Sequence, residues 1–328
     1  MIEVIFDSNA YRIFVRGKSL KQYSCELEAI KKLERKKGIQ PIQSITVLSE
    51  LFKHLLDNTN GNYQECKDAV IASSTHCAKT KGNLRTYAYA PSFDNALYLE
   101  ATGRNFPNVD YEKSVSMIAD GISKNQTDIY ISSIRASLSI NIQNEQQNRD
   151  NFFLSIKNVM KSLDPKSNDF TDFMKDKTDR RNFITFLGTD SFEKMTTFSK
   201  LDRIPKFLDP TFTITPDLVD RVSKKYLPLI QFERKFWNKV VNGIGIIDSS
   251  HKEFNTFYDI MIIFGALARN QQAIFVTNEK QIKESFAEVG LQNQIMTLDE
   301  YLKYLEKGNL LFRWCCLRKI CCLKTLFN

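Results

Sequence analysis

The sequence predicts an α/β protein in which helices cover both faces of a central parallel sheet. Short apolar runs alternate with amphipathic helical patterns near the start of the chain and again near its end, as in proteins built from βαβ units. The runs are unbroken, which favours strands that are buried on both faces. The chain has 328 residues, of which 42% are hydrophobic, enough for one large domain or two ordinary ones.

The first sixty residues follow the order strand, helix, strand, helix. Residues 2–6 (IEVIF) are the first apolar run, and residues 19–38 carry apolar side chains three or four positions apart, which predicts an amphipathic helix. Gly38 stands in the usual stop position of that helix. Residues 39–45 (IQPIQSI) predict a second strand, and residues 46–57 return to helical spacing.

The last hundred residues repeat this alternation. Three further strands are expected at 242–248, 272–277 and 293–297, and three helices at 256–270, 279–290 and 298–308. The helix over 256–270 contains few polar residues, so we expect it to be mostly buried. Together with the N-terminal elements, these segments predict a single sheet built from both ends of the chain.

The middle of the chain differs from both ends because its patterns are mainly helical. We expect helices within 110–124, 127–163 and 215–241, and loops with short helices over 164–216. The predicted organisation is a discontinuous α/β domain (1–74 plus 236–306), a mainly helical insertion (75–235) and a Cys-rich basic tail (307–328). The paired cysteines of the tail are open to three interpretations: a soft-metal site, lipidation, or an extension without function.

Composition narrows the classes of function. No signal-peptide pattern and no apolar run of about 18 residues occurs, so we expect a cytoplasmic protein without a membrane span. The seven cysteines do not have the spacing of a secreted disulfide framework. The net charge of +8 is compatible with a polyanionic partner. Three histidines without shared spacing argue against a zinc site, and no Gly-rich phosphate loop is present.

Polar residues follow the predicted strands at the edge where parallel sheets form their sites. Asp7 follows the first strand, and Thr277, Asn278 and Glu279 come at the end of the strand 272–277. Glu50 lies one turn into the helix after the second strand, and Asp259 lies near the start of the helix that precedes 272–277, so both could point to the same edge. Four carboxylates that converge in one cleft repel one another and raise their own pKa values, unless a cation neutralises them. Mg²⁺ and Mn²⁺ prefer carboxylate oxygens, and such sites are suited to the hydrolysis of phosphodiesters. The sequence therefore predicts a site for Mg²⁺ or Mn²⁺ at this edge.

Four segments, in order, resemble the motifs of the PIN-domain nucleases. They are VIFDSNAY, ITVLSELFKHL, YDIMIIFGALARNQQAIFVTNEKQI and IMTLDEYLKYL. The resemblance implies a PIN-like three-layer α/β/α sandwich. It places the family's four acidic residues, which bind metal and act in catalysis, on Asp7, Glu50, Asp259 and Glu279. Thr277 falls on the family's threonine, and Asn9 and Asn278 are accessory candidates.

The resemblance also implies a function. We expect a metal-dependent endoribonuclease that uses Mg²⁺ or Mn²⁺, with RNA preferred over DNA. Small members of the family serve as toxins that a protein partner restrains, so an inhibitory or regulatory partner, a homo-oligomer and a role in defence or stress are further expectations by analogy. The alternatives are a structure-specific DNA nuclease, and an inactive PIN-like module that binds RNA or a protein.

Each acid also has an interpretation without catalysis. Asp7 could cap the turn after the first strand. Glu50 could be a solvated residue of its helix. Asp259 and Glu279 could be acids near helix N-termini, where the macrodipole favours negative charge. None of these explains why all four acids stand at positions expected to meet.

Overall fold

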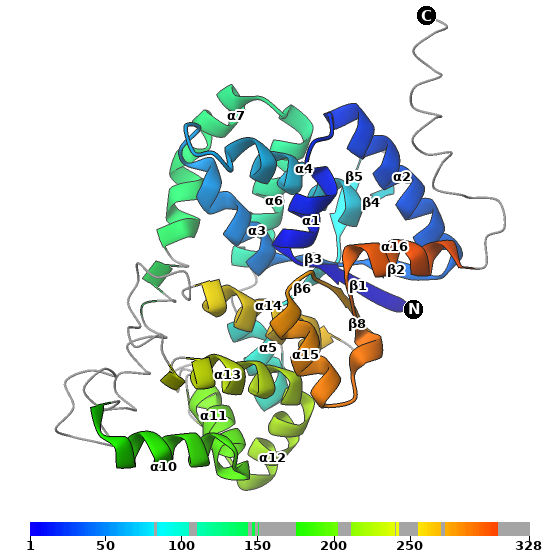
Figure 1. Cartoon of the computed structure of the whole chain (residues 1–328). Helices are drawn as coiled ribbons and strands as arrows, with labels where there is room; N and C mark the ends of the chain where they lie inside the picture. Colours follow the sequence, from blue (N-terminus) through cyan, green and yellow to red (C-terminus); the bar gives the residue numbers. More distant parts are fainter. Residues whose placement is uncertain are drawn as a thin grey trace, which may run out of the picture.

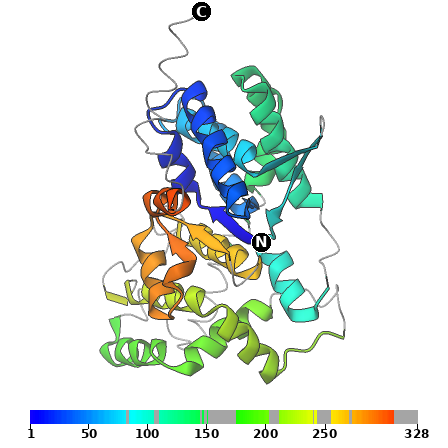
Figure 2. The same cartoon turned by 90° about the vertical axis from the view of Figure 1, so that its right-hand side faces the viewer.

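A four-stranded parallel sheet lies at the centre of the computed structural model (Figures 1 and 2). The structure describes residues 1–81, 84–104, 110–143, 146–147, 150, 175–202, 211–239, 241–242, 255–269 and 273–307. The strand order is β2-β1-β7-β8, with β1 at Ile2–Phe6, β2 at Ile39–Pro41, β7 at Ile274–Val276 and β8 at Ile295–Met296. The two ends of the chain therefore build one sheet, and the prediction of an α/β fold is confirmed.

Helices cover both faces of this sheet (Figure 1). One face carries α1 (Ser8–Val15), α2 (Leu20–Lys36), α4 (Tyr63–Cys77) and α16 (Leu298–Glu306). The other carries α14 (Asn255–Arg269) and α15 (Lys280–Glu288), and α13 (Leu227–Lys239) packs on these two helices. Phe6 packs against the rings of Tyr11 and Tyr301 on the first face. Phe275 packs against Phe286 on the second.

The remaining elements come from the segments between these strands. They are β3 (Gln43–Ser44), α3 (Ile45–Phe52), the 3₁₀ helix η1 (Lys53–Leu55), β4 (Ala78–Lys81), β5 (Leu84–Tyr87), β6 (Tyr89–Ala90), α5 (Phe93–Thr102), α6 (Asp110–Asn125), α7 (Asp128–Ser133), α10 (Lys177–Leu187), α11 (Asp190–Leu201), α12 (Pro216–Lys225) and η4 (Gln292–Gln294). β3 pairs with β6 in parallel, and β4 pairs with β5 in an antiparallel hairpin.

Local sequence signals explain several helix boundaries. Ser19 and Thr297 each form a capping box at the start of α2 and α16, where the side chain accepts a hydrogen bond from the third helical residue. Gly38 and Gly290 follow α2 and α15 with φ of 65° and 75°, a backbone conformation that glycine adopts readily. These four signals can be read directly from the sequence.

The structure differs from the prediction at several elements. The segment 39–45 contains two strands, because β2 pairs with β1 whereas β3 turns away to pair with β6. The middle of the chain supplies the hairpin β4–β5, and α10 and α11 are full helices in a region predicted to be mostly loops. α1 and α4 are also additional elements. The strand expected at 242–248 and the tail lie largely outside the described residues.

One hydrophobic core joins the sheet to the predicted insertion. Its buried residues come from the strands and their covering helices, and also from Val115, Ala119 and Ile122 of α6. A second, smaller core gathers Phe183 and Phe236 with neighbours from α10, α11 and α13. The domain boundaries proposed from the sequence stay a prediction. Among the described residues, no helix is long and apolar enough to cross a membrane.

A polar network is buried between the sheet and the helices above it. The Tyr301 hydroxyl donates to Oε1 of Glu34 (2.7 Å), which also lies 2.9 Å from Nε2 of His76. Nδ1 of His76 is 3.0 Å from the Tyr11 hydroxyl. Each of these four side chains is at most 2% exposed. Because buried polar groups are costly when they lose a partner, this network fixes α1, α2, α4 and α16 relative to one another.

We expect Tyr301→Phe to lower the free energy of unfolding by about 1–3 kcal/mol, because Glu34 loses a buried hydrogen bond. Urea unfolding measures this through the midpoint, with an unchanged m value. The matched control is Tyr304→Phe on the same helix, since Tyr304 is half-buried and its hydroxyl makes no hydrogen bond with the described residues. Equal midpoints for the two variants would contradict a stabilising role for the network.

Candidate active site

Asp7 joins the end of β1 to the start of α1. Its backbone N–H donates to the carbonyl of Val276 (3.0 Å), and its side chain accepts from the backbone N–H of Ala10. The side chain is the N-cap of α1 and the residue is only 4% exposed. Asp7 therefore does cap α1, as one interpretation of the sequence proposed. The capping hydrogen bond also fixes the carboxyl group of Asp7 at the carboxyl edge of the sheet.

Thr277 links Asp7 to the residues that follow β7. It is fully buried, and its backbone N–H donates to the carbonyl of Met296 on β8 (2.9 Å). Its hydroxyl accepts from the backbone N–H of Glu279 (3.0 Å) and is hydrogen-bonded to the carboxyl group of Asp7. The threonine singled out from the sequence thus holds two of the four acids in place.

The accessory asparagines have separate roles. Nδ2 of Asn9 donates to Oε1 of Glu279 (2.6 Å), a contact between residues 270 positions apart. Oδ1 of Asn278 accepts from the backbone N–H of Leu298 at the start of α16 (3.1 Å). Asn9 therefore orients one of the acids, whereas Asn278 connects the end of β7 to the end of β8.

Glu50 and Asp259 reach the same region from two helices that pack against each other. Glu50 is the sixth residue of α3, whose N-cap is the Ser44 side chain, and Asp259 is the fifth residue of α14. α3 and α14 are in contact, and both acidic residues are half-buried. Their neighbours on these helices, Leu48 and Ile260 among them, belong to the core. Burial of these apolar neighbours holds both helices at the edge of the sheet.

The electrostatic effects of the four acids on one another place their carboxyl groups in one region. Burial raises the pKa of Asp7 to about 7; hydrogen bonds from Thr277 and Ala10 oppose this effect, and the charges of Glu50 and Glu279 add to it. Burial also raises the pKa of Asp259 well above its usual range, with further contributions from Glu50, Glu279 and Asp7. The structure therefore brings together all four acids that the sequence singled out, and we call them the acid cluster.

Lys53 is a residue of this site that the sequence analysis did not identify. It stands three positions after Glu50, and its ammonium group lies 4.5 Å from the centre of the Tyr258 ring. Its charge lowers the pKa of Asp259. The pKa of His54 is lowered to about 4, mainly by burial and further by the charges of Lys53 and Arg12. The signal that could have revealed Lys53 is its spacing from Glu50, which places both on one helix face.

The acid cluster offers oxygen ligands, which suit a hard divalent cation in chemical terms. The mutual repulsion of its carboxylates is the condition that a bound cation would relieve. Within the described residues, however, no group of three or more His, Cys, Asp or Glu side chains is arranged to hold a metal ion.

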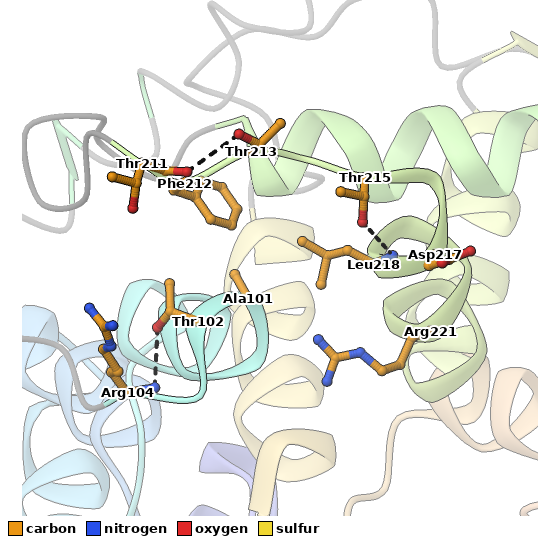
Figure 3. A pocket seen from close by; sticks show the side chains of 10 residues that line it. All are labelled: Ala101, Thr102, Arg104, Thr211, Phe212, Thr213, Thr215, Asp217, Leu218 and Arg221. Atoms are coloured by element: carbon orange, nitrogen blue, oxygen red, sulfur yellow. Dashed lines mark hydrogen bonds between the residues drawn. The ribbon is translucent and has the colours of Figure 1, made fainter.

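A separate pocket of about 480 Å³ lies between the end of α5 and the start of α12. Figure 3 shows that the guanidinium group of Arg221 points into it, while Thr215 caps the following helix. None of the acid cluster lines this pocket. The carboxylates and this pocket are therefore distinct features of the molecule.

Comparison with protein-family models, with curated proteins and with solved structures finds no match to this chain. The resemblance to PIN-domain nucleases rests on the motifs and their order alone. It stays a prediction, and so do the roles of the acids in metal binding and catalysis.

The raised pKa of Asp7 predicts how stability depends on pH. Between about pH 4 and pH 7 the unfolded chain has ionised this carboxyl, whereas the folded chain retains its proton. Folding then takes up a proton, so this group makes stability fall as the pH rises through that range. We expect Asp7→Asn, which keeps the cap, to stabilise the protein at pH 8 by up to about 4 kcal/mol and to lose this advantage towards pH 4.

The measurement is urea unfolding with a chelator present from pH 4 to 8. The matched control is Asp176→Asn, because Asp176 is also an aspartate N-cap, of the exposed start of α10. The same pH profile in both variants would show that capping, and not the acid cluster, controls the effect.

Proposed function

We propose that this protein is a PIN-like, metal-dependent nuclease that hydrolyses phosphodiester bonds, with RNA as its substrate. The observation that carries the proposal is the acid cluster itself. Four carboxyl groups from separate elements lie near one another at the carboxyl edge of a parallel sheet. Burial is the main cause of the raised pKa values of Asp7 and Asp259, and the neighbouring carboxyl charges raise them further. Acids that are buried at a cost to stability, with raised pKa values, are typical of functional sites.

In this proposal Asp7, Glu50, Asp259 and Glu279 would hold the cation. When bound, Mg²⁺ or Mn²⁺ would lower the pKa of a water molecule and neutralise charge on the phosphoryl oxygens. The protein's own groups supply the positioning. Thr277 holds Asp7 through its hydroxyl, and Asn9 holds Glu279 through its amide.

Lys53 adds a positive charge beside the acid cluster. Its ammonium group acts on Asp259 and packs on the Tyr258 ring, so it is held near the site. A lysine in this position can attract and orient a phosphate group that enters the cluster. The preference for RNA over DNA rests on the family resemblance, and a structure-specific DNA nuclease is the alternative substrate class.

A second candidate is a PIN-like module that binds RNA or a protein without cleaving it. One observation favours it: the Asp7 side chain is the N-cap of α1, a structural role that needs no metal. The two candidates make opposite predictions about the effect of added metal.

We expect the purified protein to cleave labelled single-stranded RNA when Mn²⁺ is added and not when EDTA replaces it. Asp7→Asn should lower the rate more than about 100-fold, since loss of a direct ligand exceeds the 10–100-fold effect of a supporting residue. Asp176→Asn serves as the matched capping control and should cleave as the wild type does. Cleavage that survives both EDTA and Asp7→Asn would overturn the metal mechanism, and DNA flaps as the sole substrate would favour the alternative nuclease.

Metal binding also has a readout that does not depend on activity. A cation that binds only the folded state stabilises it by about 2.7 kcal/mol at 100 times its Kd. We expect Mn²⁺ to raise the Tm of the wild type and to raise that of Asp7→Asn much less. An equal shift in the two proteins, or none in the wild type, would favour the binding module without catalysis.

A further inference from the structure

A groove is lined by residues of α15, β8 and α16. Figure 1 shows these three elements next to one another at the β8 edge of the sheet. Its volume is about 850 Å³. Ile295 and Met296 of β8 contribute to its lining, and Tyr304 of α16 adds an aromatic side chain. We call this feature the α15–α16 groove.

The charged residues of the groove are mainly basic. Its charged lining residues are Lys280, Lys283, Lys303, Lys307, Glu284 and Glu300. The two glutamates are engaged, since Lys283 pairs with Glu300 (2.7 Å) and Lys280 with Glu284 (3.7 Å). Lys303 and Lys307 are exposed and form no ion pair with other described residues. The groove therefore carries excess positive charge, which attracts a polyanion.

A further lysine reinforces this charge at the far end of α16. Nζ of Lys37 donates to the backbone carbonyl of Lys307 (2.8 Å) and lies 5.0 Å from the centre of the Tyr304 ring. Lys37 thus adds a positive charge beside Lys307, just after the C-terminal end of α16. A run of cations beside apolar and aromatic surface is the usual arrangement for single-stranded nucleic acid.

The groove and the acid cluster are joined at the end of β7. Asn278 lines the groove, and its side chain accepts from the backbone N–H of Leu298 at the start of α16. The next residue in the chain is Glu279 of the acid cluster. The groove and the acid cluster are therefore neighbours at the end of β7.

We propose that the α15–α16 groove binds the phosphate backbone of single-stranded RNA and leads it to the acid cluster. The lysines contact phosphates, and the apolar side chains of β8 and the Tyr304 ring face the bases. This inference rests on the proposed nuclease function and names the strandedness and path of its substrate. A site between two helices suits a single strand, whose bases are free of a partner strand.

The test compares two double variants with the same net charge. Lys303→Gln with Lys307→Gln neutralises the groove, and Lys177→Gln with Lys224→Gln neutralises two exposed lysines of α10 and α12. The probe is a fluorescein-labelled 15-nucleotide single-stranded RNA, and anisotropy gives Kd in EDTA over a series of salt concentrations. Unfolding midpoints confirm that each variant is folded.

We expect the groove variant to bind about tenfold more weakly than wild type. The slope of log Kd against log salt should fall by about 1.4, because each phosphate contact on a single strand contributes about 0.7. The α10/α12 variant should keep the affinity and slope of the wild type. Equal behaviour of both variants, or tighter binding of duplex RNA than of the single strand, would overturn the inference.

The outcomes separate the groove from the proposed nuclease activity. RNA cleavage by the wild type with unchanged Kd and kcat/KM in the groove variant would reject the groove and leave the function standing. Binding that depends on the groove, without cleavage by the wild type in Mn²⁺, would reject the function and leave the groove standing. Failure of the wild type to bind RNA would reject the groove.

Discussion

The parallel pairing of β1 with β7 is the interaction on which the rest of the site depends. Val4, Ile5 and Phe6 lie opposite Ile274, Phe275 and Val276, and the ladder continues where the Asp7 N–H donates to Val276. Since parallel neighbours end at the same edge, this register brings residues about 270 positions apart into contact. A slip of one residue would turn the side chains of the shifted strand, Phe6 of β1 or Phe275 of β7 among them, to the wrong face. It would also separate Asp7 from Thr277.

At this edge of the sheet, the burial of carboxyl groups lowers the stability of the fold but serves the proposed function. Asp7 is buried, so its ionised form is costly, yet its hydrogen bonds to Ala10 and Thr277 hold it in place. Burial of the apolar residues of β1 and β7 in the core contributes favourable free energy that offsets this cost. The buried network of Glu34, His76 and Tyr301 has a different part, since it ties together the helices above the sheet. Burial of polar groups is thus structural in this network. In the acid cluster it also brings like charges close together, beside the cap that Asp7 forms on α1.

Much of this fold could be predicted from the sequence because its signals are local. The strand 2–6, the helix ending at Gly38 and the order of the C-terminal elements follow from apolar runs and caps. The helix α4 could not be predicted in this way. Residues on nearly all its sides are buried, Val70 and Ser74 among them, so its sequence has no amphipathic period. α1 is short, and its start at Asp7 resembles a turn. The meeting of Glu50 with Asp259 was expected from strand order, but it requires the packing of α3 on α14, which no local signal specifies.

The negative charge of the acid cluster can be neutralised by protons or, in the proposed function, by a divalent cation. At neutral pH the raised pKa values of Asp7 and Asp259 limit the negative charge that the fold must bury. A divalent cation and these protons compete for the same oxygens, because both neutralise the carboxylates. Loss of the protons favours the cation, and the cation would favour closer approach of the four groups. Asn9 donates a hydrogen bond to Glu279, and Thr277 is hydrogen-bonded to Asp7, so both acids are held where β1 and β7 end and where the proposed cation would bind.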